Sequence, residues 1–135
     1  MGLRARLAVA AQGDDGSSPV EFVLVGTLLT VLTLGVLQFG LAVYVRNVVH
    51  DAAVEGAYHA ALADTSLDEG AQRTRDIVSR TVGSDYATAV SVRENSALGH
   101  PTVEITVQTV LPLVGLLGAP RTMEVTAHAP NESFD

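Results

Sequence analysis

An uncharged apolar run of 24 residues, from Phe22 to Val45, constrains this chain more than any other feature of its 135 residues. At a rise of about 1.5 Å per residue, a helix of this length spans roughly 36 Å, which is enough to cross a hydrocarbon core of about 30 Å. A buried helix of this kind in a water-soluble protein would need a much larger protein around it. The run therefore predicts a membrane-spanning helix, with the carboxylate of Glu21 directly at its start.

The rest of the composition excludes several classes of function. About 90 residues follow the run, which is enough for one small domain over 46–135. The net charge is −7, and from Arg46 onward there are six arginines and twelve acidic residues, so the chain lacks the cationic surface that nucleic acid requires. No cysteine is present, which excludes disulfides, thiolate zinc sites and cysteine nucleophiles. The four histidines lack metal-ligand spacing, and we expect no metal, no cofactor and no catalytic activity.

Basic residues on either side of the run predict its orientation. Arg4 and Arg6 precede it and Arg46 follows it. Because Lys and Arg are enriched on the cytoplasmic side, this balance favours a cytoplasmic N-terminus and an outer domain. A cleaved secretory signal is the alternative, but its apolar region would span only about 7–15 residues. The longer run here ends with Tyr44, which is typical of an interfacial anchor.

The segment before the run is polar and rich in turn-forming residues over 11–19. Ser17 and Ser18 are suitable helix N-caps, and Pro19 suits the first helical turn. Glu21 is then expected in the first turn, where a carboxylate interacts favourably with the helix dipole. The alternative explanation is that a partner binds Glu21, because carboxylates near lipid are costly and usually paired.

Three segments of the chain carry a resemblance to a known family. Residues 16–22, Gly-Ser-Ser-Pro-Val-Glu-Phe, followed by a long apolar helix, resemble the prepilin processing signal of the type IV pilin superfamily. The segments 46–57 and 107–129 are similar to the corresponding parts of TadE-like proteins, the small pseudopilins of the Flp, or Tad, pilus apparatus. Pro19 departs from the pattern, in which a small residue is expected.

The resemblance implies a maturation step and a role in assembly. A prepilin peptidase would cut after Gly16, so that residues 1–16 form a leader, Ser17 becomes the first residue and Glu21, followed by Phe22, becomes the fifth. The new α-amino group, with a pKa of about 8, would pair with Glu21 of a neighbouring subunit and set the register of the two helices. The chain would then be a minor pilin or pseudopilin of the bacterial cytoplasmic membrane. Its partners would be the bilayer, the peptidase, other pilins and the assembly platform.

Two other functions remain open. The first is an uncleaved single-pass anchor whose outer domain binds a partner at the cell surface. The second is a small membrane-bound enzyme or sensor.

One face of the membrane helix carries mostly small residues. At 100° per residue, this small-residue face lies within roughly 80° and comprises Gly26, Thr30, Thr33 and Gly40, together with Leu37. Small residues let membrane helices approach closely, and threonine hydroxyls can bond across the interface. The face therefore indicates a subunit contact, although glycine and threonine are also ordinary in membrane helices.

The remaining sequence predicts an α+β fold with a pilin-like plan. The helix is expected to continue to Ala63, with an apolar stripe of Val49, Ala52, Ala53, Ala57 and Ala60 at helical spacing. A second helix is expected over 67–82, with a capping box formed by Ser66 and Glu69. Alternating residues over 86–93, 102–108 and 122–128 predict three antiparallel strands, each with one buried face. The membrane helix over 17–45 would thus precede a head of one or two helices and a small sheet.

An apolar segment over 111–118 lies between the second and third expected strands. It is too short to cross a membrane. It would cover the core of the head, contact a partner pilin or dip into the bilayer surface, and the sequence leaves these three alternatives open.

Overall fold

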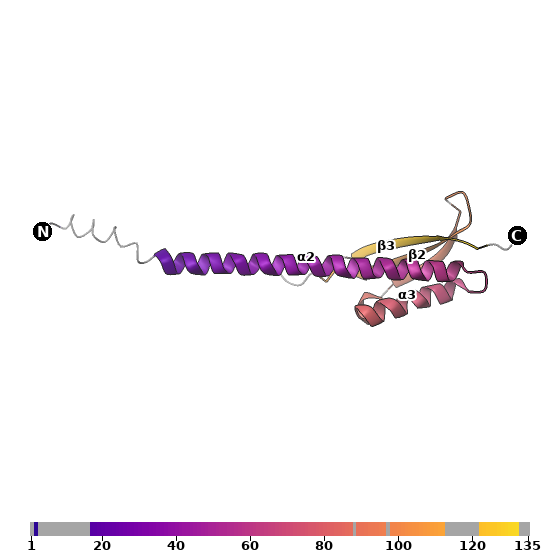
Figure 1. The fold of residues 1–135 in the computed structure, drawn as a ribbon, viewed down its shortest axis with the longest axis horizontal. Helices are drawn as coiled ribbons and strands as arrows, with labels where there is room; N and C mark the ends of the chain where they lie inside the picture. The colour runs from indigo at the N-terminus through magenta and orange to yellow at the C-terminus, as the bar shows by residue number, and fades with distance from the viewer. Residues whose placement is uncertain (1, 3–16, 88, 97, 113–121, 133–135) are drawn as a thin grey trace. The chain divides into compact units, whose positions relative to one another are not determined.

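The computed structural model describes residue 2 and residues 17–87, 89–96, 98–112 and 122–132. The elements in chain order are α2 (Ser17–Ala61), α3 (Leu67–Thr81), a short 3-10 helix η2 (Ser84–Tyr86) and the strands β1 (Ala89–Asn95), β2 (Thr102–Val110) and β3 (Thr122–Pro130) (Figure 1). The predicted α+β class, the long N-terminal helix and the three-stranded antiparallel sheet are confirmed. One compact unit ends at Leu37 and the second, which we call the head, begins at Gln38.

The end of α2 is fixed by hydrogen bonds to its last carbonyl groups. The hydroxyl of Thr65 donates to the carbonyls of His59 and Leu62. The backbone N–H of Glu132, beyond β3, donates to the carbonyl of Ala61 at 3.0 Å. These bonds satisfy acceptors that lack a partner inside the helix. They also explain why α2 ends at Ala61 rather than continuing to Ala63 as expected.

The start of α3 is set by the predicted capping box. The Ser66 hydroxyl accepts from the backbone N–H of Glu69 at 3.3 Å, and the Glu69 carboxylate accepts from the backbone N–H of Ser66 at 2.7 Å. In Figure 1, α3 runs back along the C-terminal part of α2. Its buried residues are Gly70, Ala71, Thr74 and Val78, and the rest of the helix is mostly polar, as expected for a surface helix.

The core of the head is built on the predicted apolar stripe of α2. Val49, Ala52, Ala53, Ala57 and Ala60 are all buried, which confirms the stripe. They belong to one cluster with Ala71 and Val78 of α3 and with the inward side chains of the sheet, Val90, Val103, Ile105, Val107, Val125, Ala127 and Ala129. Small side chains on α2 therefore let the neighbouring elements approach its backbone closely.

The closest approach between α2 and α3 occurs at Gly56 and Gly70. A Cβ atom added to Gly56 would lie 1.9 Å from the Thr74 hydroxyl and 2.6 Å from the Gly70 carbonyl oxygen. A Cβ atom added to Gly70 would lie 2.3 Å from the Ala60 Cβ atom. The Thr74 hydroxyl, buried at this crossing, lies within hydrogen-bond distance of the carbonyls of Gly70 and Ala52. Only glycine fits at either of the two positions without a shift of the backbone.

The sheet has the order β1-β2-β3 with both pairs antiparallel. Val107 pairs with Val90 on one side and with Val125 on the other, so the apolar residues of the three strands share one face. The expectation of one buried face fails for the central strand, because Thr102 and Glu104 on its outer face are also buried. Long side chains from the two neighbouring strands cover the outer face of β2 at this end.

The first strand begins later than the sequence pattern predicts. Residues Ser84–Tyr86 form η2, in which the N–H groups of Tyr86 and Ala87 donate to the carbonyls of Gly83 and Ser84. These turn bonds engage backbone groups that a strand would need for its ladder. Between β1 and β2, the N–H of Gly99 donates to the Ser96 carbonyl at 3.0 Å, and Gly99 has a φ of 84°.

Candidate functional site

The first unit presents an apolar surface that nothing in the chain covers. Every side chain from Ser18 to Leu37 is exposed, and the most apolar stretch of 18 residues in α2 has a mean hydropathy of 2.2 with none of it buried. Water-soluble monomers rarely expose apolar patches of more than a few hundred Å². The helix is long and apolar enough to cross a membrane, and this property indicates membrane anchoring.

The residues of the expected processing signal lie at the start of α2. Gly16 is outside the described residues, and Ser17 is the first residue of the helix. Ser17 and Ser18 are therefore part of the helix rather than caps before it. Glu21 is exposed and stands fifth in the helix, whereas the first turn contains no acid, so the expected first-turn position of Glu21 is wrong. Its nearness to the helix dipole explains Glu21 less well than expected, because the effect falls off beyond the first turn.

The small-residue face is open in the isolated chain. A Cβ atom added to Gly26 or Gly40 would meet no atom within 4 Å. The Thr30 hydroxyl donates to the Gly26 carbonyl at 2.8 Å, so it is satisfied within its own helix and keeps acceptor capacity for a neighbour. Phe22 is 79% exposed. The face is thus accessible to another helix, as its residue pattern predicts.

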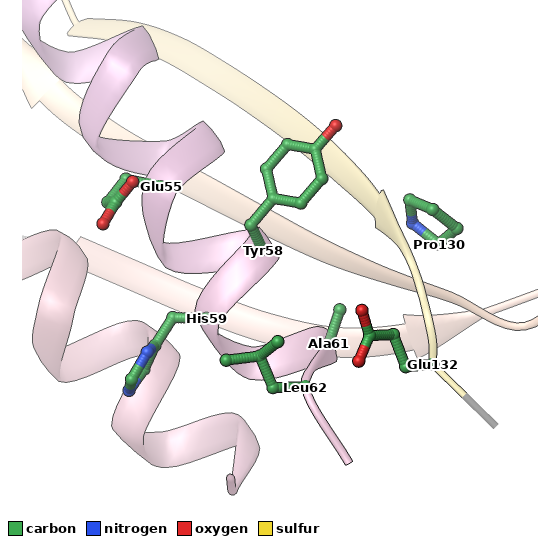
Figure 2. Close-up of a pocket in the computed structure, with 7 residues that line it drawn as sticks. All are labelled: Glu55, Tyr58, His59, Ala61, Leu62, Pro130 and Glu132. Atoms are coloured by element: carbon green, nitrogen blue, oxygen red, sulfur yellow. The ribbon is translucent and has the colours of Figure 1, made fainter. Parts of the chain in front are cut away.

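The head carries a shallow hollow where α2 and β3 end. It has a volume of about 260 Å³ and is lined by Glu55, Tyr58, His59, Ala61, Leu62, Pro130 and Glu132 (Figure 2). The carboxylate of Glu55 is paired with Arg73 of α3 at 3.1 Å. Among the described residues no three acidic or histidine side chains are placed to hold a metal ion. The hollow therefore offers a surface for contact, with no catalytic constellation around it.

A buried carboxylate on the outer face of the sheet was not predicted. The side chain of Glu104 is 7% exposed and accepts hydrogen bonds from Arg93 Nε at 2.7 Å and Asn95 Nδ2 at 3.0 Å. His128 Nδ1 lies 3.7 Å from the second carboxylate oxygen. The Asn95 amide and the Arg93 guanidinium lower the pKa of Glu104 below its ordinary value of 4.5, against the opposing effect of burial. Strand register brings these side chains together, since Glu104 is directly opposite both Arg93 and His128.

Protonation of Glu104 is expected to weaken the head in acid. Because the pKa of Glu104 is lower in the folded chain, its stabilising contribution is present above pH 4.5 and is lost as the pH falls through the folded pKa. Glu104→Gln should lower the free energy of unfolding at pH 7 by about 1–2 kcal/mol, because two donors lose a charged acceptor. It should also flatten the dependence of stability on pH below 4.5.

Pulse proteolysis of the full chain in detergent and urea measures both effects. Glu124→Gln is the matched control, because Glu124 lies exposed on the same face and bonds the Gln108 amide at 3.0 Å. An unchanged pH profile for Glu104→Gln would show that the cluster does not stabilise the head.

The apolar segment over 111–118 is only partly described. Leu111 is half-buried and Pro112 is buried, while residues 113–118 lie outside the described residues. The three alternatives for this segment therefore stay as predictions.

The comparisons with known proteins agree with the resemblance given by the sequence. The family model of TadE-like proteins matches residues 16–57. Comparison with curated proteins and with solved structures gave no match. The matched segment contains the start of α2, the exposed apolar stretch and the stripe that packs in the head. The family indicates association with the Tad pilus. Over residues 16–57, from the expected processing site to the core of the head, this chain is TadE-like.

Proposed function

We propose that this protein is a minor pilin or pseudopilin, a structural subunit in the assembly of a bacterial Flp/Tad-type pilus or a related secretion machine. The observation that carries the proposal is the TadE-like match, which begins at Gly16 itself and runs through the exposed apolar helix. A prepilin peptidase removes residues 1–16, and the bilayer receives the exposed part of α2. The N-terminus is cytoplasmic and the head is outside, in agreement with the arginines that flank the apolar run.

The role is structural and involves no catalysis or cofactor. After cleavage, the α-amino group of Ser17 pairs with Glu21 of a neighbouring pilin, and the small-residue face lets the helices approach. A charge pair near lipid contributes more to register than to net affinity, because desolvation offsets much of its attraction. The other pilins and the assembly platform complete the environment that the isolated chain lacks.

The mass of the membrane-extracted protein tests the processing step. We expect the loss of residues 1–16, with Ser17 at the N-terminus. The sequence contains no lysine, so an amine-reactive label should modify only the α-amino group and identify it by peptide mapping. A label found on Met1 would favour the alternative function, an uncleaved anchor with a surface-exposed binding domain.

The small-residue face is tested by filling it. Gly26→Leu should reduce the co-purification of two differently tagged copies by about tenfold, equivalent to about 1.4 kcal/mol, because the larger side chain holds the helices apart. Gly35→Leu is the matched control, since Gly35 is equally open and lies about 180° around the helix. Equal effects of the two substitutions would argue against a specific contact at this face.

A further inference from the structure

The part of α2 that belongs to the head has one covered side and one open side. The covered side contains the buried residues Val45, Val49, Ala53 and Ala57. The open side contains two large aromatic residues, Tyr44 at 51% and Tyr58 at 57% exposure, with the Asp51 side chain at 85% exposure between them. The three are spaced by seven residues and so share one face of the helix.

Opposite charges stand at the two edges of this open side. Arg46 and Asp51 are five residues apart, which places them about 140° apart around the helix. They cannot pair within one chain, and within the described residues Arg46 makes no ion pair, although it is exposed. Asp51 contacts only the adjacent His50 ring, at 3.8 Å, among the described ion pairs. One edge is thus a free cation and the other a weakly engaged carboxylate.

We propose that Arg46 of a second copy of this chain binds Asp51, on the face defined by Tyr44 and Tyr58. The inference rests on the proposed function, since it deepens the same assembly contact. The pair requires that neighbouring helices be offset by about five residues, close to the offset of four that the Ser17–Glu21 pair requires. One register therefore satisfies both pairs, at the two ends of the apolar segment.

Charge complementarity favours a second copy in this polar arrangement. A symmetric pair of copies through the same face would place Asp51 against Asp51, with like charges opposed. Joining the Arg46 edge of one copy to the Asp51 edge of the next brings opposite charges together and leaves both outer edges free for further copies. Such a heterologous contact does not close on itself in a pair, so it propagates into a filament.

Cysteine crosslinking tests the contact in a chain that has no cysteine of its own. Phe39 and Tyr44 have the same separation as Arg46 and Asp51, one heptad earlier, and both are exposed. We expect Phe39→Cys in one tagged copy to form a disulfide with Tyr44→Cys in the other, in membranes that contain both full chains. Helix axes about 8–10 Å apart bring facing Cα atoms within disulfide range. Predominant Tyr44–Tyr44 products from copies that carry only Tyr44→Cys would overturn the polar arrangement.

Charge reversal separates the ion pair from simple proximity. Arg46→Glu or Asp51→Arg in all copies should reduce the Phe39–Tyr44 product by about fivefold, and the two changes together should restore it. Equal yields in all four backgrounds would remove the proposed pair. The mass of the same samples distinguishes the two failures: a chain trimmed to Ser17 without this product contradicts only the Arg46–Asp51 contact, whereas a chain that retains Met1 contradicts the proposed function.

Discussion

Gly56→Ala is expected to lower the free energy of unfolding of the head by about 3 kcal/mol, even though alanine is the better helix former by about 1 kcal/mol. The added Cβ atom would lie 1.9 Å from the Thr74 hydroxyl and 2.6 Å from the Gly70 carbonyl oxygen. The hydroxyl can rotate away only by giving up its buried hydrogen bonds, and the carbonyl belongs to the backbone of α3. The two helices must therefore separate, which opens the core beside Ile105. The urea midpoint of the head, measured by pulse proteolysis of the full chain, reports this loss.

The sign of the effect distinguishes packing from helix propensity. Gly40→Ala is the matched control, because Gly40 lies in α2 and in the same unit but has open space around it. Gly40→Ala should leave the midpoint unchanged or raise it slightly. If Gly56→Ala also left the midpoint unchanged or raised it, the close approach of α2 and α3 at this glycine would be refuted.

Glu21→Gln should leave membrane insertion intact and reduce incorporation with other pilins by about tenfold or more. Glutamine keeps the shape and hydrogen-bonding capacity of the side chain but removes the charge that would pair with the Ser17 α-amino group of a neighbour. Loss of one partner leaves the remaining charge uncompensated near lipid, and such losses are typically worth several kcal/mol. The fraction of the protein that co-fractionates with sheared surface pili or crosslinks to other pilins measures the effect.

A conservative change elsewhere controls for a general effect of lost charge. Asp64→Asn removes an exposed carboxylate in the turn after α2 and should assemble normally. Carbonate extraction of the membranes shows that both variants remain inserted. Normal assembly of Glu21→Gln would exclude the proposed role of this carboxylate.

The elements that the sequence predicted well are those set by local chemistry. The apolar run, the alanine stripe and the Ser66–Glu69 capping box depend on spacing along one helix, and all three are present. Gly56, by contrast, reads locally as a weak point in a helix, and only the approach of α3 explains it. The burial of Glu104 was missed because it depends on which residues the strand register places beside it.

The candidate site was predicted in part, for a related physical reason. Glu21 and the small-residue face are readable from composition and helical spacing, because they concern one helix. The Tyr44, Asp51 and Tyr58 face becomes recognisable only once the head covers the other side of α2. A surface that functions by contact is defined by what remains uncovered, and a pattern along the chain cannot specify that.

The turn between β1 and β2 has a practical consequence for following this protein in cells. Gly99 is exposed, adopts a conformation that larger residues avoid, and has no neighbouring atom within 4 Å of where a side chain would begin. Exposed turns of this kind accept extra residues more readily than the strands they join. A short epitope placed after Gly99 should therefore be displayed by the folded head, so that antibody labelling of intact cells reveals on which side of the envelope the head resides.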